Sequence, residues 1–400
     1  MLSTLDNIES SPTLLNDVVN DINLLSSFIK KEFSFALKNN FKRKRKLSPQ
    51  LLLYIITKVI GSAKSYHTVL DSLKLEKIVN IKEQSVNEKL QQIDYSEIES
   101  FNTKLCTYVF PTGQKRNLAV DCVRVNLYCV LEEFGIHKSQ NGGCCTAIIS
   151  AIIDVETNIP INYHIHLGSN QRDAIREQLK YVNKETDTLI FDRGYFSEDF
   201  FFFDELTEKK INFIFRIKIG SLFARNFKND NNKMSDTVYI KIGKIKKAVR
   251  VVKYKIDTET IILCTSHNDL TVDYLRVLYH KRWQIETQFN FIKHKLSFSN
   301  IKSKSLNRVR QDVCIHQFIM TLCFYIQSLL YKKINYSTEK KIHTTSTLNI
   351  IHDKFLLQML NLENKMSNDR DKNDIILHNL TTIATSTVKV IDNRHYEMRE

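Results

Sequence analysis

The sequence lacks the cysteine spacing and the long apolar runs that mark several classes of protein. Its eight cysteines form no Cys-x-x-Cys pair and no zinc-ligand spacing, which argues against a cysteine-based zinc domain. Most of them lie within apolar runs, as buried thiols do, so a reducing compartment is expected. The longest apolar stretch, residues 318–331, is interrupted by Gln327 and falls short of the roughly 18 residues of a membrane span. The N-terminus has no apolar signal core, so we expect no membrane partner.

Glycine, proline and tryptophan are scarce as well, with nine, four and one copies in 400 residues. Together with abundant Lys, Asn and Ile, this scarcity indicates an AT-rich genome. No internal repeat or low-complexity tract is present. A hydrophobic share of 42% and a charged share of 26% are typical of a globular chain, and the length suffices for two or three domains.

Positive charge is in clear excess. Lys and Arg outnumber Asp and Glu by 58 to 44, which gives a net charge of +14 and suggests a polyanionic partner. Nucleic acid is the first candidate and an anionic membrane surface the second, while a solvated lysine coat is the simplest alternative. Five cations are consecutive, namely Lys42, Arg43, Lys44, Arg45 and Lys46. This run must face solvent or phosphate, as a solvated loop, a nuclear-import patch or a DNA contact.

Helix signals dominate the first hundred residues. Ser48 and Pro49 form an N-cap and first-turn pair, and Gly61 supplies a stop. Ser85 and Glu88 have the spacing of a capping box, which predicts the start of another helix.

From about residue 117 the pattern changes to strands. Alternating or apolar runs predict strands at 117–127, 146–154, 159–166 and 188–191, with a helix at 169–182. Asp121 lies in the first of these strands, and Asp192 ends the last. Residues 200–270 form a second β-rich and strongly basic stretch, which includes Lys246 and Lys247.

The stretch from Tyr274 to Leu296 predicts one continuous helix. At about 100° per residue, Tyr279, Arg282, Glu286 and Lys293 share a face about 60° wide, beside an apolar stripe. A polar stripe is usually only a solvated face, but this one mixes types that suit phosphodiester chemistry. A carboxylate can hold a metal ion, and an arginine and a lysine can hold phosphates.

The same four residues match a family signature. Tyr279-x2-Arg282-x3-Glu286-x6-Lys293 resembles the Tyr-x2-Arg-x3-Glu-x6-Lys signature of DDE transposases of the insertion-sequence-four family. Asp192-Arg193-Gly194-Tyr195 is similar to that family's second-aspartate motif. Asp121 stands where the first aspartate is expected, although Cys122-Val123 follow it in place of the usual Gly-Ser/Thr.

The resemblance implies a metal-dependent phosphoryl-transfer enzyme. Asp121, Asp192 and Glu286 would be the catalytic carboxylates and would hold two Mg²⁺ ions, or Mn²⁺ instead. Water would free a 3′-OH at the end of the element, and that 3′-OH would attack target DNA, or first the opposite strand to form a hairpin. The resemblance also implies DNA contacts for Tyr279, Arg282 and Lys293. From their positive charge we further expect DNA contacts for Arg193, Lys42, Arg43, Lys44, Arg45, Lys246 and Lys247.

The implied fold is α/β: a ribonuclease-H-like mixed sheet flanked by helices, interrupted by a β-rich insertion and preceded by a helical domain. We expect a helical DNA-binding region at 1–110, core segments at 115–200 and 271–335, the insertion at 201–270 and a C-terminal tail at 336–400. The tail is expected to be helical, to serve dimerisation or to be disordered. A homodimer on double-stranded DNA is expected, in the bacterial cytoplasm at the nucleoid, or in the nucleus if the host is eukaryotic.

Several alternatives stay open. Asp199 and Asp204 lie close to Asp192 and compete for the role of second carboxylate. His164 and His166 share one face of a strand and could bind a metal, but no third ligand is evident and such pairs are more often structural. A catalytically idle DNA-binding descendant and another ribonuclease-H-like nuclease are the rival functions. Short inverted repeats flanking the gene would distinguish a transposase from both.

Overall fold

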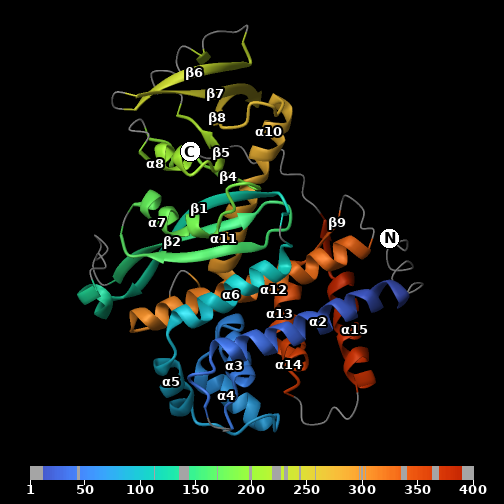
Figure 1. Ribbon diagram of the computed structural model, residues 1–400. Helices are drawn as coiled ribbons and strands as arrows, with labels where there is room; N and C mark the ends of the chain where they lie inside the picture. The colour runs from blue at the N-terminus through green and yellow to red at the C-terminus, as the bar shows by residue number, and fades with distance from the viewer. Residues whose placement is uncertain are drawn as a thin grey trace. The chain divides into compact units, whose positions relative to one another are not determined.

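The computed structural model (Figure 1) describes residues 12–42, 46–111, 113–134, 144–168, 170–197, 201–218, 227–228, 233–242, 245–256, 258–296, 298, 301, 303–334, 340–362 and 369–389. The chain divides into two compact units. The helical unit comprises Met1–Leu105, Lys295–Ser297 and Cys314–Glu400, and the sheet unit comprises Cys106–His294 and Phe298–Val313.

The helical unit is built from both ends of the chain. Its elements are α2 (Pro12–Ala36), α3 (Pro49–Gly61), α4 (Tyr66–Leu75), α5 (Glu83–Gln92), most of α6 (Tyr95–Val109), most of α12 (Leu306–Lys333), β9 (Lys340–Ile342), α13 (Thr344–Ile350), a π-helical turn (Ile351–Phe355), α14 (Leu356–Met359), α15 (Asp369–Thr385) and β10 (Thr387–Lys389). β9 and β10 pair antiparallel.

The start and stop signals of α3 are confirmed. The Ser48 hydroxyl accepts a hydrogen bond from the Leu51 amide at 3.1 Å, Pro49 is the first helical residue, and the helix ends at Gly61. The capping box predicted at Ser85 is wrong. α5 begins two residues earlier, at Glu83, so Ser85 lies inside the helix.

Part of the predicted C-terminal tail is folded onto the N-terminal helices. α14 and α15 pack against α2, where Asn23 Nδ2 donates to Asn373 Oδ1 at 2.9 Å. The Tyr54 hydroxyl of α3 donates to the Asp353 carbonyl at 3.3 Å. Residues 340–362 and 369–389 therefore contribute to the core of the helical unit.

α12 is long and apolar enough to cross a membrane by length and composition alone. Its most apolar window has 89% of its residues buried inside the protein. A core helix of a globular protein meets the same criteria, so this helix is weak evidence for a membrane span.

The sheet unit contains an eight-stranded mixed sheet. Its strands are β1 (Arg116–Tyr128), β2 (Cys144–Asp154), β3 (Pro160–His166), β4 (Asp187–Phe191), β5 (Asn212–Arg216), β6 (Ser235–Ile242), β7 (Ile245–Ile256) and β8 (Glu259–Thr265), in the order β3-β2-β1-β4-β5-β8-β7-β6. β1, β4 and β5 are parallel to one another, and the other neighbours pair antiparallel. The strands of the predicted insertion thus extend the same sheet.

Helices cover both faces of this sheet. They are α7 (Gln171–Gln178), α8 (Phe201–Glu208), α10 (Val272–Lys281) and α11 (Trp283–Lys295), with 3₁₀ turns at Cys129–Phe134 and Leu179–Tyr181. Figure 1 shows α7 in front of β1 and β2 and α11 behind them.

The strand register assigns side chains to these two faces. Asp121 of β1 aligns with Ala151 of β2 and Tyr163 of β3, on the face covered by α11. The next residue, Cys122, aligns across β2 with His164, on the face that α7 covers. Because neighbouring residues of a strand point to opposite faces, β1 serves both.

Candidate active site

Two parallel strands bring Asp121 and Asp192 to the same part of the sheet. β1 and β4 pair in register up to Val120 and Phe191, and each aspartate is the next residue along its strand. Phe191 is fully buried and stacks on Phe215 with ring centroids 4.4 Å apart. Buried apolar residues therefore fix the backbone immediately before Asp192.

Glu286 reaches this place from a pair of helices. The predicted continuous helix is wrong, because α10 ends at Lys281 and α11 begins at Trp283. Arg282 lies at the junction, where its amide donates to the Tyr279 carbonyl and its carbonyl accepts from the Ile285 amide, both at 3.1 Å. These three-residue bonds tighten the backbone locally, and the Arg282 side chain is turned into the protein.

The guanidinium of Arg282 lies among all three carboxylates. Its terminal nitrogens are 2.6 Å from Glu286 Oε1, 3.8 Å from Asp192 Oδ1 and 3.9 Å from Asp121 Oδ2. The Arg282 side chain is 4% exposed, whereas those of Asp192 and Glu286 are 34% and 36% exposed. Arg282 therefore lies buried beneath the cluster, whereas Asp192 and Glu286 are partly open to solvent.

Aromatic side chains complete the surroundings of Arg282. The Tyr279 hydroxyl donates to Asp192 Oδ1 at 3.3 Å. The Arg282 guanidinium carbon lies 5.8 Å from the Tyr279 ring centroid and 5.6 Å from that of Trp283, within the range of cation–π attraction. Although burial alone would lower the pKa of Arg282, Tyr279 and the carboxylates outweigh it and keep the arginine charged.

The site carries more negative charge than its arginine can neutralise. Burial raises the pKa of the Asp121 carboxyl to about 6; Arg282 and the Cys122 amide oppose this shift, while Glu286 and Asp192 add to it. Three carboxylates facing one guanidinium form a hard oxygen donor set with unbalanced charge. That combination fits a divalent cation such as Mg²⁺.

Contacts missed by the sequence interpretation hold α11 on the sheet. Gln288 of α11, five residues beyond Trp283, accepts from the Tyr163 hydroxyl at 2.7 Å and donates to the Asn158 carbonyl at 2.7 Å. A buried glutamine within the apolar stripe of this helix was the signal that could have revealed the contact. At the end of α10, Lys281 forms an ion pair with Glu156 at 2.7 Å.

The departure from the usual motif at Cys122 has a structural partner. The Tyr195 hydroxyl donates to Cys122 Sγ at 2.9 Å, on the α7 side of the sheet. Tyr195 is buried, and its own carbonyl accepts from Arg172 Nε of α7 at 3.1 Å. The two segments that carry Asp121 and Asp192 are thus joined by a tyrosine–cysteine contact.

The other predicted site residues are not brought to the carboxylates by any contact within the described part of the chain. Lys293 lies half-buried on α11, and Arg193 and Lys42 are exposed. Lys246 and Lys247 lie at the start of strand β7. The side chains of these last two lysines and of Asp204, and the whole of Arg43, Lys44, Arg45 and Asp199, lie outside the described residues.

A comparison with protein-family models matches part of this chain to one family. Residues 115–323, just over half of the chain, match the model of the transposase DDE domain. No curated protein matches the chain. Among solved structures, it is similar to the cryo-EM structure of the piggyBac transposase synaptic complex with hairpin DNA, with 11% identity and a TM-score of 0.49 over 89% of this chain and 84% of that chain. The extent of the family match shows that this chain belongs to the transposase DDE domain family.

Proposed function

We propose that this chain is a cut-and-paste DNA transposase of the insertion-sequence-four type. It would cleave phosphodiester bonds at the ends of its own element and transfer the freed strands to target DNA. The observation that carries this proposal is the convergence of Asp121, Asp192 and Glu286 on Arg282, with every carboxylate within 3.9 Å of its terminal nitrogens. Asp121 comes from β1, Asp192 directly follows β4, Arg282 lies at the α10–α11 junction and Glu286 lies in the first turn of α11.

The order of the strands supports a ribonuclease-H-like core. β3, β2 and β1 pair antiparallel in sequence, and β4 and β5 then add in parallel to β1. On this assignment β6 to β8 belong to the insertion between the second and third carboxylates. On the same assignment, residues 1–110 would be the helical DNA-binding region, and residues 115–200 and 271–335 would form the catalytic core.

Asp121, Asp192 and Glu286 would hold divalent metal, two Mg²⁺ or Mn²⁺ ions per site. When bound, such ions lower the pKa of coordinated water and stabilise charge on phosphoryl oxygens. The described geometry supports this role because the donors are carboxylate oxygens and two of them face solvent.

The other side chains of the site would bind and orient DNA. Arg282 would contribute its charge to the binding of a phosphate between the carboxylates, where its terminal nitrogens lie within 3.9 Å of Asp121 and Asp192 and 4% of its side chain is exposed. Tyr279 orients Asp192 through its hydroxyl and stays protonated, because burial raises its pKa above the ordinary value. Lys293 would contact a phosphate farther along α11 as a point charge.

Double-stranded DNA is the proposed partner, both as element ends and as target. The net charge of +14 and the exposed Lys42, the first residue of the basic run 42–46, support phosphate binding. A transposase must bring two element ends together, so a homodimer on DNA is proposed. Its place would be the bacterial nucleoid, or the nucleus in a eukaryotic host.

The decisive experiment is a cleavage assay on the ends of the element with Mg²⁺ or Mn²⁺. The wild type is compared with Asp192→Asn and Glu286→Gln, each of which keeps the shape of the side chain and removes its charge. Both variants are expected to lose cleavage by at least about a thousandfold while DNA binding is retained.

Asp236→Asn provides the matched control. The Asp236 side chain on β6 is 39% exposed, close to the value for Asp192, and within the described part of the chain it forms an ion pair with the exposed Lys233. This variant is expected to cleave normally. Full activity of Asp192→Asn or Glu286→Gln would remove that residue from the proposed site, and full activity of both would favour a different nuclease centre.

A further inference from the structure

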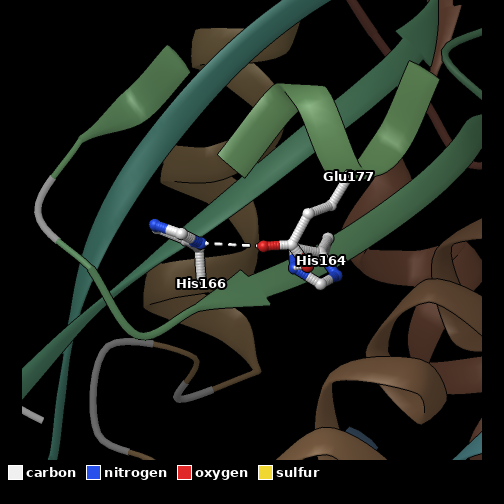
Figure 2. Close-up of side chains that lie close together, drawn as sticks. All are labelled: His164, His166 and Glu177. Carbon is white, nitrogen blue, oxygen red and sulfur yellow. Dashed lines mark hydrogen bonds and ion pairs between the residues drawn. The ribbon is translucent and has the colours of Figure 1, made fainter. Parts of the chain in front are cut away.

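Two histidines and a glutamate meet on the face of the sheet opposite the carboxylates. His164 and His166 are on the edge strand β3, and Glu177 is in the last turn of α7. His164 Nε2 is 2.9 Å from Glu177 Oε2, and His166 Nδ1 is 3.1 Å from Glu177 Oε1. Figure 2 shows both rings directed toward the glutamate, which extends from the helix to the strand.

We propose that His164, His166 and Glu177 form a second metal site, specific for a transition-metal ion such as Zn²⁺. One ligand atom from each residue lies within 4.8 Å of the others, so small side-chain movements suffice for all three to bind one ion. Two imidazoles and one carboxylate are a common zinc donor set, and a water molecule can complete the tetrahedron. Mg²⁺ is disfavoured, because it prefers an all-oxygen shell.

The backbone around the three ligands is held independently of them. In the same turn of α7, Gln178 Nε2 donates to Asn162 Oδ1 of β3 at 2.7 Å. The amide of Arg172 is capped by Asn170 at the start of the helix, at 3.0 Å. Strand and helix are therefore fixed beside one another before any ion binds, which lowers the entropy lost on binding.

Gly168 has no side chain, and this leaves space for the imidazole ring of His166. A Cβ atom built on this glycine would lie 2.5 Å from His166 Nε2, a clash that would displace the ring. Binding through Nδ1 requires the tautomer whose proton is on Nε2, the nitrogen on the Gly168 side. Gly168 is thus a positioning residue that can be changed without removing a ligand.

An ion at this site would act on structure. It would fasten the end of α7 to the edge of the sheet. α7 also carries Arg172, whose Nε donates to the Tyr195 carbonyl in the loop after Asp192. The site is separate from the carboxylates, because His164 aligns with Cys122 on one face of the sheet and Asp121 points to the other.

The test is titration of the purified full-length chain with Zn²⁺ in excess Mg²⁺, which occupies oxygen-only sites. Calorimetry is expected to give one saturable Zn²⁺ per chain. Co²⁺ in its place should give the intense visible absorption of a tetrahedral site with nitrogen ligands. Glu177→Gln and His166→Ala are each expected to weaken Zn²⁺ binding by at least about tenfold, and Gly168→Ala is expected to weaken it with all ligands present.

His67→Ala is the matched control. His67 also pairs with a carboxylate, at 2.9 Å from Asp71, but among the described residues no third His, Cys, Asp or Glu joins that pair to form a metal-binding group. The His67→Ala variant should therefore bind Zn²⁺ as the wild type does. The Glu177 side chain is 53% exposed, so Glu177→Gln should keep the fold, which circular dichroism checks.

Hydrogen exchange supplies a readout on structure, since Zn²⁺ should protect the amides of α7 in the wild type but not in Glu177→Gln. Three results would overturn the proposal: no saturable binding in excess Mg²⁺, equal binding in Glu177→Gln and wild type, or equal loss in His67→Ala.

Discussion

The two faces of one sheet carry clusters of opposite chemical character. On the face covered by α11, three carboxylates surround a buried guanidinium, and every potential metal donor is a hard oxygen. On the face covered by α7, two imidazoles face a half-exposed carboxylate, and nitrogen donors predominate. The first cluster suits Mg²⁺ and the second Zn²⁺.

The difference shows how a sheet separates two chemistries within a short distance along the chain. Asp121 and Cys122 are adjacent in sequence, yet one faces the carboxylate cluster and the other lies on the side of the histidine cluster. The pleat, rather than distance along the chain, decides which environment each residue enters. Five substitutions test this contrast.

The largest effect is expected for the buried arginine. Arg282→Ala leaves Asp121, Asp192 and Glu286 to repel one another without a cation. We expect the free energy of unfolding of the metal-free protein to fall by about 3 kcal/mol or more. Chemical denaturation in EDTA measures this change, and added Mg²⁺ should restore part of the loss.

Arg176→Ala sharpens the same comparison on the other face. Arg176 of α7 also contacts two carboxylates, those of Asp173 and Glu205, but it lies nearer solvent, at 24% exposed. Its loss should lower the free energy of unfolding by about 1 kcal/mol or less. Equal losses in the two variants would contradict the view that Arg282 neutralises a buried cluster.

The next effect concerns pH. The folded-state pKa of Asp121, about 6, is higher than the ordinary value of 3.8, so the folded protein binds an extra proton between these values. The free energy of unfolding of the metal-free protein should therefore rise as pH falls from about 6 to about 4, by up to about 2 kcal/mol from this group.

Asp121→Asn should abolish that contribution. The neutral amide avoids the penalty for burying a charge, so the metal-free variant is expected to be more stable than wild type at pH 8. Unfolding curves from pH 4 to 8 in EDTA measure both slopes. Parallel curves for the two proteins would show that Asp121 has no raised pKa.

An intermediate effect is expected at the contact that holds α11 on the hairpin. Gln288→Leu removes one hydrogen bond to the Tyr163 hydroxyl and one to the Asn158 carbonyl. The expected loss is about 1 to 2 kcal/mol, with DNA cleavage reduced as Glu286 becomes less well positioned. Unfolding and cleavage assays would be run together, and unchanged values in both would exclude a positioning role.

The smallest effect is expected for the ion pair at the end of α10. Lys281 and Glu156 have side chains 35% and 51% exposed, so solvent screens their attraction. Lys281→Ala should change the free energy of unfolding by less than about 0.5 kcal/mol, and less still at high salt. A larger loss would mean that this pair, rather than Gln288, fixes α11.

The strands that carry the two aspartates were predictable, because their signals are local. Apolar runs before Asp121 and Asp192 predict β1 and β4 whatever the rest of the chain does. The break between α10 and α11 at Arg282 was not predictable from local signals. It occurs where the Arg282 side chain contacts Asp121 and Asp192, which are distant in the sequence. Ser85 failed as a cap for the opposite reason, since α5 begins earlier without any side-chain cap.

The third residue of the histidine cluster was not found from the sequence, because it comes from another element. His164 and His166 share a strand face by simple alternation, but only the packing of α7 on β3 brings Glu177 to them. Likewise, helical spacing groups Lys293 with Glu286, but no contact of the described residues links Lys293 to the carboxylates. Sequence periodicity predicts which side chains share a face of one helix or strand. It does not predict which side chains of other elements they contact.

The in-register pairing of β1 and β4 has a consequence for how such chains can diverge. Neighbouring strands are held about 4.8 Å apart by backbone hydrogen bonds, whatever lies between them in sequence. The spacing of Asp121 and Asp192 is therefore set by the ladder that ends at Val120 and Phe191. The long intervening segment can gain or lose residues at its turns without moving either carboxylate, so its length is open to evolutionary change while the pair is not.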